Sequence, residues 1–554
     1  MFFFVFFACR GYTLFSQTSP NTYWVQFTDK ARSDYSLSSP ETFLSERAIR
    51  KRIKQNIPFD SLDLPVSKYY VDSLKRMGFK IQNTSRWFNA VTVYVTDSTL
   101  VYEKLQDVSF IKLYSKSTPK NKLEPHAKEY SPVELKSIGE NPSLLNYGHA
   151  HRQITLSKGD YLHQKGYWGE GIHVAVIDAG FSRVKVLPAF NSLYQNNRVL
   201  GAIDFTGTTN DVYSSHTHGT YVLSIMASAL PGRLIGTAPS ATYWLLQSEV
   251  GFYEHLIEED NWVAAIEFAD SAGVDVVNSS LGYTRFDFPE NSHVYSDMDG
   301  NTTRVTRAAD IAASKGIIVV TSAGNSGNTS WRFISAPADA DSVLAVGAVD
   351  SVGHVTSFSS RGPSADGRIK PDVSAMGKAV AFQFLDSSIV RGNGTSFSSP
   401  VVAGLTACLW QAFPEASNMQ VINAIKKGAR QYISPDNEYG YGIANFEVAF
   451  DILHFIFPEK REYGDKQNQM VVSPNPFHDK LEIKLLELEE QKVKITFYDL
   501  MGRKILEDNI YVDYPFEKIN ITGFSNFNEG IYILKVEGNG INLSRKILKI
   551  NEAR

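Results

Sequence analysis

Four short segments of this chain carry residue types that together could activate a serine hydroxyl. They are IDAG around Asp178, HTHGTYV around His218, SAGNSGN around Asn325 and GTSFSSP around Ser396. A serine becomes a strong nucleophile when a neutral imidazole takes its proton, a carboxylate orients that imidazole, and fixed N–H donors bind the oxyanion. The chain has one candidate for each task, so the segments predict acyl transfer through a serine.

The acid and the base lie where a parallel sheet would place a site. Asp178 closes the apolar run IHVAVI, and sites of such sheets lie just beyond the carboxyl ends of the strands. His216 and His218 are two residues apart, which on a strand could also form a metal pair. No Cys or Glu nearby completes a coordination set, and His218 opens an apolar helical run, so we predict His218 as the base. A purely structural aspartate is the alternative for Asp178.

The serine segment predicts a nucleophile at the start of a helix. Gly394 allows a close approach of backbone and substrate, and the apolar run VVAGLTACLW follows Ser396. We expect Pro400 in the first turn, where its missing N–H has no intrahelical role. Taken alone, this segment could be a serine-rich turn, and the segment of Asn325 a glycine-rich turn.

The order Asp, His, Ser is that of subtilisin. With the four motifs it makes roughly residues 150 to 455 resemble the subtilisin-like serine proteases. The resemblance implies a triad of Asp178, His218 and Ser396, and an oxyanion hole formed by Asn325 and the N–H of Ser396. It also implies two walls of a specificity pocket, Ser280, Leu281 and Gly282 on one side and Ser322, Ala323 and Gly324 on the other.

Two positions depart from the pattern of that family. Ala179 stands where the family usually has Thr or Ser, so a hydroxyl that would support Asp178 is missing. Such a loss is worth on the order of 1 kcal/mol, which weakens a loop more readily than it abolishes catalysis. Tyr221 stands where a second histidine is common, outside the proton path.

Changes in composition and hydrophobic pattern along the chain predict several domains. The expected boundaries are a signal peptide at 1–17, a propeptide at 22–115, a connector and processing region at 116–150, the catalytic domain at 151–456, a linker at 457–470 and a C-terminal domain at 471–554. The first eight residues are apolar but too short to span a bilayer, and a lipid anchor on Cys9 is the weaker alternative. The region 22–115 has mixed helix and strand periods and resembles the ferredoxin-like inhibitory propeptide of the subtilisins; an accessory domain is the alternative.

The two later regions predict different folds. Apolar runs alternate with helical segments in the middle region, which indicates an α/β fold with a parallel sheet covered on both faces. From residue 471 short alternating strands indicate a small β-sandwich. PNPF at 474–477, YDLMGRKI at 498–505 and GIYILKV at 530–536 make it resemble the C-terminal sorting domain of type IX secretion substrates in Bacteroidetes. A carbohydrate-binding or adhesive module is the alternative.

The composition of the chain limits the classes of partner that can be expected. The chain has 554 residues, with 55 basic against 59 acidic residues, so a nucleic-acid partner is not expected. Of two cysteines only Cys408 would remain after removal of the signal, and we expect it to pack in the core. The resemblance implies a secreted or cell-surface zymogen that is monomeric, cleaves protein or peptide substrates and needs no cofactor. A structural calcium ion would suit the family, but no carboxylate-rich loop places one. A catalytically dead binding protein is the rival function.

Overall fold

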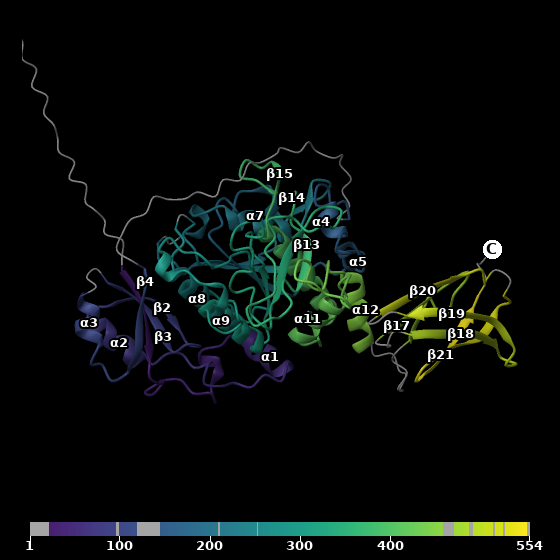
Figure 1. Ribbon diagram of the computed structural model, residues 1–554, viewed down its shortest axis with the longest axis horizontal. Coiled ribbons are helices and arrows are strands. Elements are labelled where there is room, and N and C mark those ends of the chain that lie inside the picture. The colour runs from purple at the N-terminus through teal and green to yellow at the C-terminus, as the bar shows by residue number, and fades with distance from the viewer. Residues whose placement is uncertain are drawn as a thin grey trace, which may run out of the picture.

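The computed structural model describes residues 21–95, 99–118, 145–208, 211–251, 253–457, 470–486, 491–512, 516–524 and 527–550. The predicted signal peptide, connector residues 119–144 and linker residues 458–469 lie outside these ranges. Figure 1 shows three parts along the long axis of the molecule, an N-terminal α+β part, a central α/β part and a C-terminal all-β part.

The N-terminal part is an antiparallel sheet in the order β2-β3-β1-β4 with helices between its strands. Its elements are β1 (Asn21–Phe27), α1 (Glu46–Lys54), α2 (Lys68–Arg76), β2 (Lys80–Ser85), β3 (Ala90–Val95), α3 (Thr99–Leu105) and β4 (Ile111–Thr118). Without α1, this is the ferredoxin-like β-α-β-β-α-β order. Helix α1 begins at Glu46, because the Ser45 side chain caps it by accepting from Ala48 N.

The central part contains a seven-stranded parallel sheet in the order β13-β12-β11-β10-β5-β9-β6. Its strands are β5 (His173–Asp178), β6 (Val199–Asp204), β9 (Thr242–Gln247), β10 (Val276–Ser279), β11 (Ile318–Ser322), β12 (Leu344–Val349) and β13 (Val373–Met376). The sheet agrees with the apolar runs expected in this region, and the run IHVAVI that Asp178 closes forms β5. The order reverses next to β5, with β10 on one side and β9 on the other, so Asp178 ends a strand at the switch point of the sheet.

Helices cover both faces of this sheet. On one face Val174 and Val176 of β5 share a core with α7 (His218–Ala227) and α10 (Thr395–Ala412). On the other, Ala175 and Ile177 pack with α8 (Ile257–Ala272) and α9 (Arg304–Ser314). This split follows from the alternation of side chains along a strand. Smaller elements are α4 (His151–Thr155), α5 (Gly159–Gln164), α6 (Asn191–Gln195), β7 (Ala229–Leu230), β8 (Leu234–Ile235), β14 (Val380–Gln383), β15 (Ile389–Gly392), α11 (Asn418–Lys427) and α12 (Phe446–Ile456).

The C-terminal part consists of two antiparallel sheets, β16-β17-β20 and β19-β18-β21-β22, that share one apolar core. The strands are β16 (Met470–Ser473), β17 (Lys480–Leu486), β18 (Gln491–Asp499), β19 (Lys504–Val512), β20 (Phe516–Thr522), β21 (Gly530–Gly538) and β22 (Ile541–Lys549). Lys484 Nζ lies 2.7 Å from Asp451 Oδ1 and links this part to α12. The α/β domain with its α+β and β-sandwich neighbours therefore has the predicted fold class.

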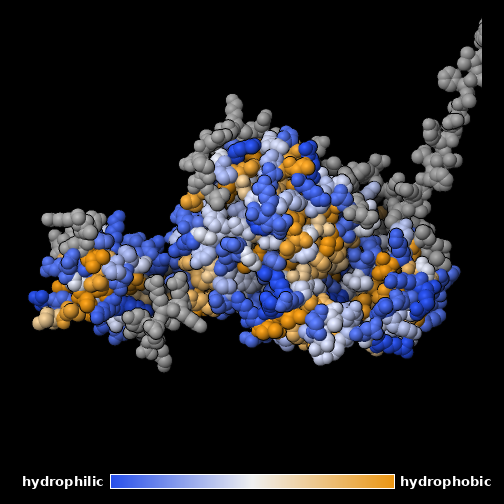
Figure 2. Space-filling model, turned by 180° about the vertical axis from the view of Figure 1, so that it is seen from behind, coloured by the Kyte–Doolittle hydropathy of each residue, from blue (hydrophilic) through white to orange (hydrophobic). Residues whose placement is uncertain are grey.

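The molecular surface mixes polar and apolar residues, as the face in Figure 2 shows. In the described ranges no helix is both long enough and apolar enough to cross a membrane. Cys408 is fully buried in α10, as expected for a core residue, and burial raises the pKa of its thiol.

Candidate active site

The predicted acid and base meet at the carboxyl end of β5. Asp178 Oδ1 lies 2.8 Å from His218 Nδ1; Asp178 is fully buried and His218 is 7% exposed. His218 is the first residue of α7, and Gly219 follows it against the loop after β5. A Cβ at position 219 would lie 2.5 Å from the carbonyl oxygen of Gly180, so only glycine lets the helix start this close to Asp178.

Because Ala179 has no hydroxyl, the second carboxylate oxygen of Asp178 receives no donor from the next side chain. Oδ1 accepts from Ala179 N at 2.8 Å in addition to its contact with His218. Oδ2 is buried, and within the described ranges it has no hydrogen-bond partner. Because the next side chain is a methyl group, it cannot supply a hydroxyl donor there.

The candidate nucleophile lies in the first turn of α10. Ser396 is 9% exposed, and its Oγ donates to Ser280 O at 3.1 Å. The ring of Phe397 lies 6.2 Å from the His218 ring, centroid to centroid, in a stacked arrangement. Ser396 and His218 both line one cleft of about 340 Å³, together with Asn325. The four predicted segments therefore come together in one place.

Pro400 is not in the first turn of α10, and that prediction is wrong. The helix begins at Thr395, so the ring of Pro400 falls in the second turn, where an N–H would donate to the carbonyl of Ser396. That carbonyl accepts instead from Ser280 Oγ at 2.9 Å. A side chain at the end of the neighbouring strand thus replaces the helical hydrogen bond, and it links the candidate nucleophile to β10.

Asn325 presents its amide nitrogen as a donor. Its Oδ1 accepts from Thr395 N at 2.8 Å and from Thr395 Oγ1 at 3.0 Å. With the oxygen occupied on the side of α10, Nδ2 remains for a group in the cleft that Asn325 lines. The N-terminus of α10 adds its positive helix end at the same place.

The predicted substrate-binding residues lie on two sides of this cleft. Ser280, Leu281 and Gly282 line it after β10, and Ser322 and Gly324 line it after β11. Ala323 lies between the last two, but its side chain is fully buried in a small apolar cluster. Ala323 itself, predicted as a residue of the pocket, is therefore not among the residues that line the cleft.

Sequence reasoning missed Ser335, which lines the cleft between these two walls. Its hydroxyl oxygen is buried and has no hydrogen-bond partner among the residues described. A Cβ at Gly282 would lie 2.3 Å from this oxygen, and one at Gly324 would lie 3.0 Å from it. Both walls are therefore glycine where they approach the hydroxyl. No motif around Ser335 signals this role, because it depends on contacts between distant segments.

A loop before α8 completes the cleft and was also missed. Glu249, Tyr253 and Glu254 line it, and the buried Glu258 in the first turn of α8 fixes the loop by accepting from Val250 N and His255 N, both at 3.1 Å. Burial raises the pKa of Glu258, and the nearby Glu249 and Glu254 raise it further.

His216, the second histidine of its segment, also lines the cleft. Its Nδ1 accepts from His218 N at 3.2 Å, so it is a loop neighbour of the base. Within the described part of the chain no three His, Cys, Asp or Glu side chains are grouped as a metal site would require.

Comparison with known families matches each of the three parts. Residues 22–131 match the peptidase S8 propeptide domain of Bacteroidota, residues 169–442 match the subtilase family, and residues 471–550 match the secretion system C-terminal sorting domain. The sorting domain indicates a protein that is exported to the cell surface or the medium.

Similar proteins come from bacteria and plants. Subtilisin DY of Bacillus licheniformis is 32% identical over 303 residues, which cover 53% of this chain and 97% of that protein. Subtilisin E of Bacillus subtilis is 32% identical over 333 residues, 57% of this chain and 77% of that protein. Subtilisin-like protease SBT6.1 of Arabidopsis thaliana is 29% identical over 56% of this chain and 30% of its own length. The chain belongs to the subtilase family and is an exported serine endopeptidase that carries its own propeptide.

Proposed function

We propose that Ser396 is the nucleophile of this endopeptidase. His218 takes the hydroxyl proton as Ser396 Oγ attacks the peptide carbonyl, and returns it to the leaving amine when the C–N bond breaks. Water then hydrolyses the acyl-enzyme, with His218 again as base. Asp178 holds the imidazole in the tautomer that accepts at Nε2. Asn325 Nδ2 and the N–H of Ser396 bind the oxyanion. The chemistry requires no cofactor and no metal ion.

The observation that carries the proposal is the buried contact of 2.8 Å between Asp178 Oδ1 and His218 Nδ1, with Ser396 in the same cleft. Ser396 Oγ donates to Ser280 O in this structure. Catalysis needs the hydroxyl to donate to His218 instead. Substrate backbone would then pair with the edge formed by Ser280 to Gly282.

We also propose that the propeptide inhibits the enzyme and that the enzyme cuts its own connector. The ferredoxin-like part lies on α8 and α9, and β4 ends beside the first turn of α8, where Ser117 Oγ donates to Asp260 Oδ2 at 2.8 Å. The loop before that turn lines the cleft. The end of β4 therefore lies near the loop that lines the cleft. For the other partners we propose protein or peptide substrates and the type IX secretion machinery, with no nucleic acid and a monomeric enzyme.

Replacement of Ser396 tests this function. Ser396→Ala should lower kcat for a peptide substrate at least a thousandfold, since the triad of a subtilisin loses still more when its serine is removed. It should also stop processing of the connector. Ser398→Ala is the matched control, because Ser398 is buried in the same helix and donates only to Thr395 O. Equal activity of the Ser396→Ala protein would contradict the proposal, and an inactive parent would favour the binding-protein alternative.

A further inference from the structure

Backbone hydrogen bonds hold Ser335 between the two walls of the cleft. Ser335 N donates to Ala323 O at 3.2 Å, which ties the residue to the wall after β11. The next residue, Ala336, pairs with Tyr283: Tyr283 N donates to Ala336 O at 2.8 Å, and Ala336 N donates to Tyr283 O at 3.2 Å. Tyr283 directly follows Gly282 of the wall after β10. Because Ser335 is bonded towards both walls, its position between them is fixed.

The Ser335 hydroxyl is a buried donor without a partner. Ser335 is 6% exposed, and its Oγ has no hydrogen-bond partner within the described ranges. The serines of the two walls differ from it, because Ser280 Oγ donates to Ser396 O at 2.9 Å and Ser322 Oγ donates to Leu281 O at 3.2 Å. A buried polar group without a partner is costly, so one that lines a cleft points to a ligand that pairs with it.

Neither wall presents a side chain to this hydroxyl. Gly282 and Gly324 face it, and a Cβ at these positions would lie 2.3 and 3.0 Å from Ser335 Oγ. Glycine allows a close approach of the backbone to a ligand. The space in front of the hydroxyl is therefore left for a group that the substrate brings.

The same space opens beside the bond that the enzyme is proposed to cut. One wall begins at Ser280, whose carbonyl oxygen lies 3.1 Å from Ser396 Oγ, and the other ends at Gly324, which precedes Asn325. In the proposed mechanism Ser396 attacks the substrate carbonyl and Asn325 binds its oxygen. The nearest substrate side chain is therefore that of the residue that carries this carbonyl, which we call the acyl residue.

The walls and Ser335 are uncharged. Leu281 is apolar, and the other wall residues that line the cleft are serines and glycines. A charged side chain would lose its water here and gain a single hydroxyl, which is poor compensation for a buried charge. An uncharged tip that carries an oxygen can pair with the hydroxyl without that cost.

We propose that Ser335 determines specificity: its hydroxyl pairs with an uncharged polar group at the tip of the acyl residue, so the enzyme cuts after residues such as asparagine. The proposal deepens the proposed peptidase function and rests on it. An apolar side chain of the same shape leaves the hydroxyl unpaired. A site built to hydrogen-bond its substrate discriminates strongly against an analogue that lacks the bonding group.

Peptides that differ only in the acyl residue test the proposal on the mature enzyme. Asparagine, leucine and aspartate have the same number and branching of side-chain atoms, so their comparison separates hydrogen bonding and charge from size. The parent should cleave the asparagine peptide with the highest kcat/KM. Ser335→Ala should lower the ratio of kcat/KM for asparagine over leucine about tenfold or more, as expected for one buried hydrogen bond. Ser335→Cys, which replaces the hydroxyl by a weak donor, should lower the ratio as well.

Ser360→Ala is the matched control. Ser360 is fully buried, and its hydroxyl also approaches Gly324, where a Cβ would lie 2.8 Å from it. Its Oγ accepts from Ser326 N at 3.0 Å, and Ser360 is not among the described residues that line the cleft. The ratio for Ser360→Ala should equal that of the parent. This control separates loss of the Ser335 hydroxyl from loss of a buried serine nearby.

The outcomes distinguish this proposal from the proposed catalysis. A parent that prefers leucine, or a ratio that stays unchanged in Ser335→Ala, would overturn the role of Ser335. Ser396→Ala is assayed with the same peptides. Cleavage by Ser396→Ala at the parent rate would contradict the proposed nucleophile, whereas the ratios of the parent and Ser335→Ala would still decide whether Ser335 selects the acyl residue.

Discussion

At the scale of single residues, the site depends on which atoms of each side chain already have a hydrogen-bond partner. Asn325 points its Nδ2 to the cleft because Thr395 uses its oxygen twice. Asp178 keeps His218 oriented although its Oδ2 has no hydrogen-bond partner within the described ranges. Both residues were predictable from the sequence as candidates, since each lies in a short motif. Ser335 was not, because its hydroxyl meets Gly282 and Gly324 only in three dimensions.

Asn325→Ala should slow the chemical step and leave substrate binding nearly unchanged. The amide is proposed to bind the oxyanion, which exists only in the transition state and the tetrahedral intermediate. Loss of such a donor in subtilisin, a member of the same family, costs about 2.7 to 4 kcal/mol, or about 10² to 10³ in kcat. Steady-state kinetics on one peptide give kcat and KM separately. A raised KM at unchanged kcat would assign Asn325 to substrate binding instead.

At the scale of elements, strands were easier to predict than helix boundaries. Six strands of the parallel sheet were recognisable as buried apolar runs, because both of their faces are covered. β2 (Lys80–Ser85) was missed because its polar Gln82 and Asn83 both donate to Asn261 Oδ1 of α8, a contact that no local pattern reveals. Pro400 was misplaced because, even in a helix that begins at Ser396, it is the fifth residue and follows the first turn.

The bond that replaces the missing N–H of Pro400 gives a double-mutant test. Ser280→Ala should lower the free energy of unfolding by about 1 to 3 kcal/mol, because it leaves the carbonyl of Ser396 buried without a donor. In a Pro400→Ala background the new N–H can donate to that carbonyl, so the same change should cost less. The loss of the bond from Asn278 Nδ2 to Ser280 Oγ remains in both backgrounds. Urea unfolding of the four inactive Ser396→Ala chains measures the coupling. Additive losses would show that the two donors do not share the carbonyl.

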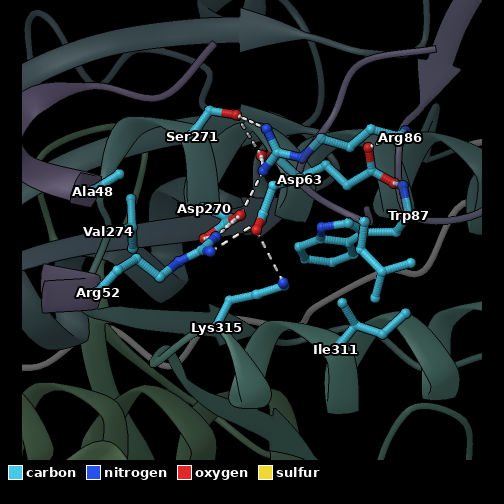
Figure 3. A network of polar contacts seen from close by, with 12 residues as sticks. Ala48, Arg52, Asp63, Arg86, Trp87, Asp270, Ser271, Val274, Ile311 and Lys315 are labelled. Carbon is cyan, nitrogen blue, oxygen red and sulfur yellow. Dashed lines mark hydrogen bonds and ion pairs between the residues drawn. The ribbon is translucent and has the colours of Figure 1, made fainter. Parts of the chain in front are cut away.

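At the scale of the whole molecule, the propeptide contacts the catalytic domain through α1 (Figure 3), and a lysine in this interface titrates. Lys51 of α1 donates to Val274 O at 2.5 Å, and burial lowers the pKa of Lys51 to about 8 in the bound state. Asp275 and Asp270 raise this pKa, whereas Arg52 and Arg47 lower it. No sequence pattern predicted the interface, because α1 resembles an ordinary solvated basic helix until it meets α8.

Propeptide binding should therefore strengthen as the pH rises from about 8 towards 10.5. Below this window Lys51 is charged in both states, and the bound state carries the full cost of burying the ammonium group. Within it the bound lysine loses its proton while the free lysine keeps it, so binding becomes more favourable with pH. The rate at which the propeptide leaves the catalytic domain after the connector has been cut, measured at several pH values, checks this. Lys51→Met should flatten the profile; a parent profile that is flat, or that rises, contradicts the assignment.

The central claim, that Ser396 is a nucleophile activated by His218, is tested most directly by a fluorophosphonate probe on the mature enzyme. Mass spectrometry of the labelled protein should find one adduct, on the peptide that contains Ser396. A His218→Ala chain cannot process itself, so its connector is cut by an added protease; it should then give no adduct, because no base takes the proton of the hydroxyl. An adduct on another serine, or labelling of Ser396 at an unchanged rate without His218, would contradict the account.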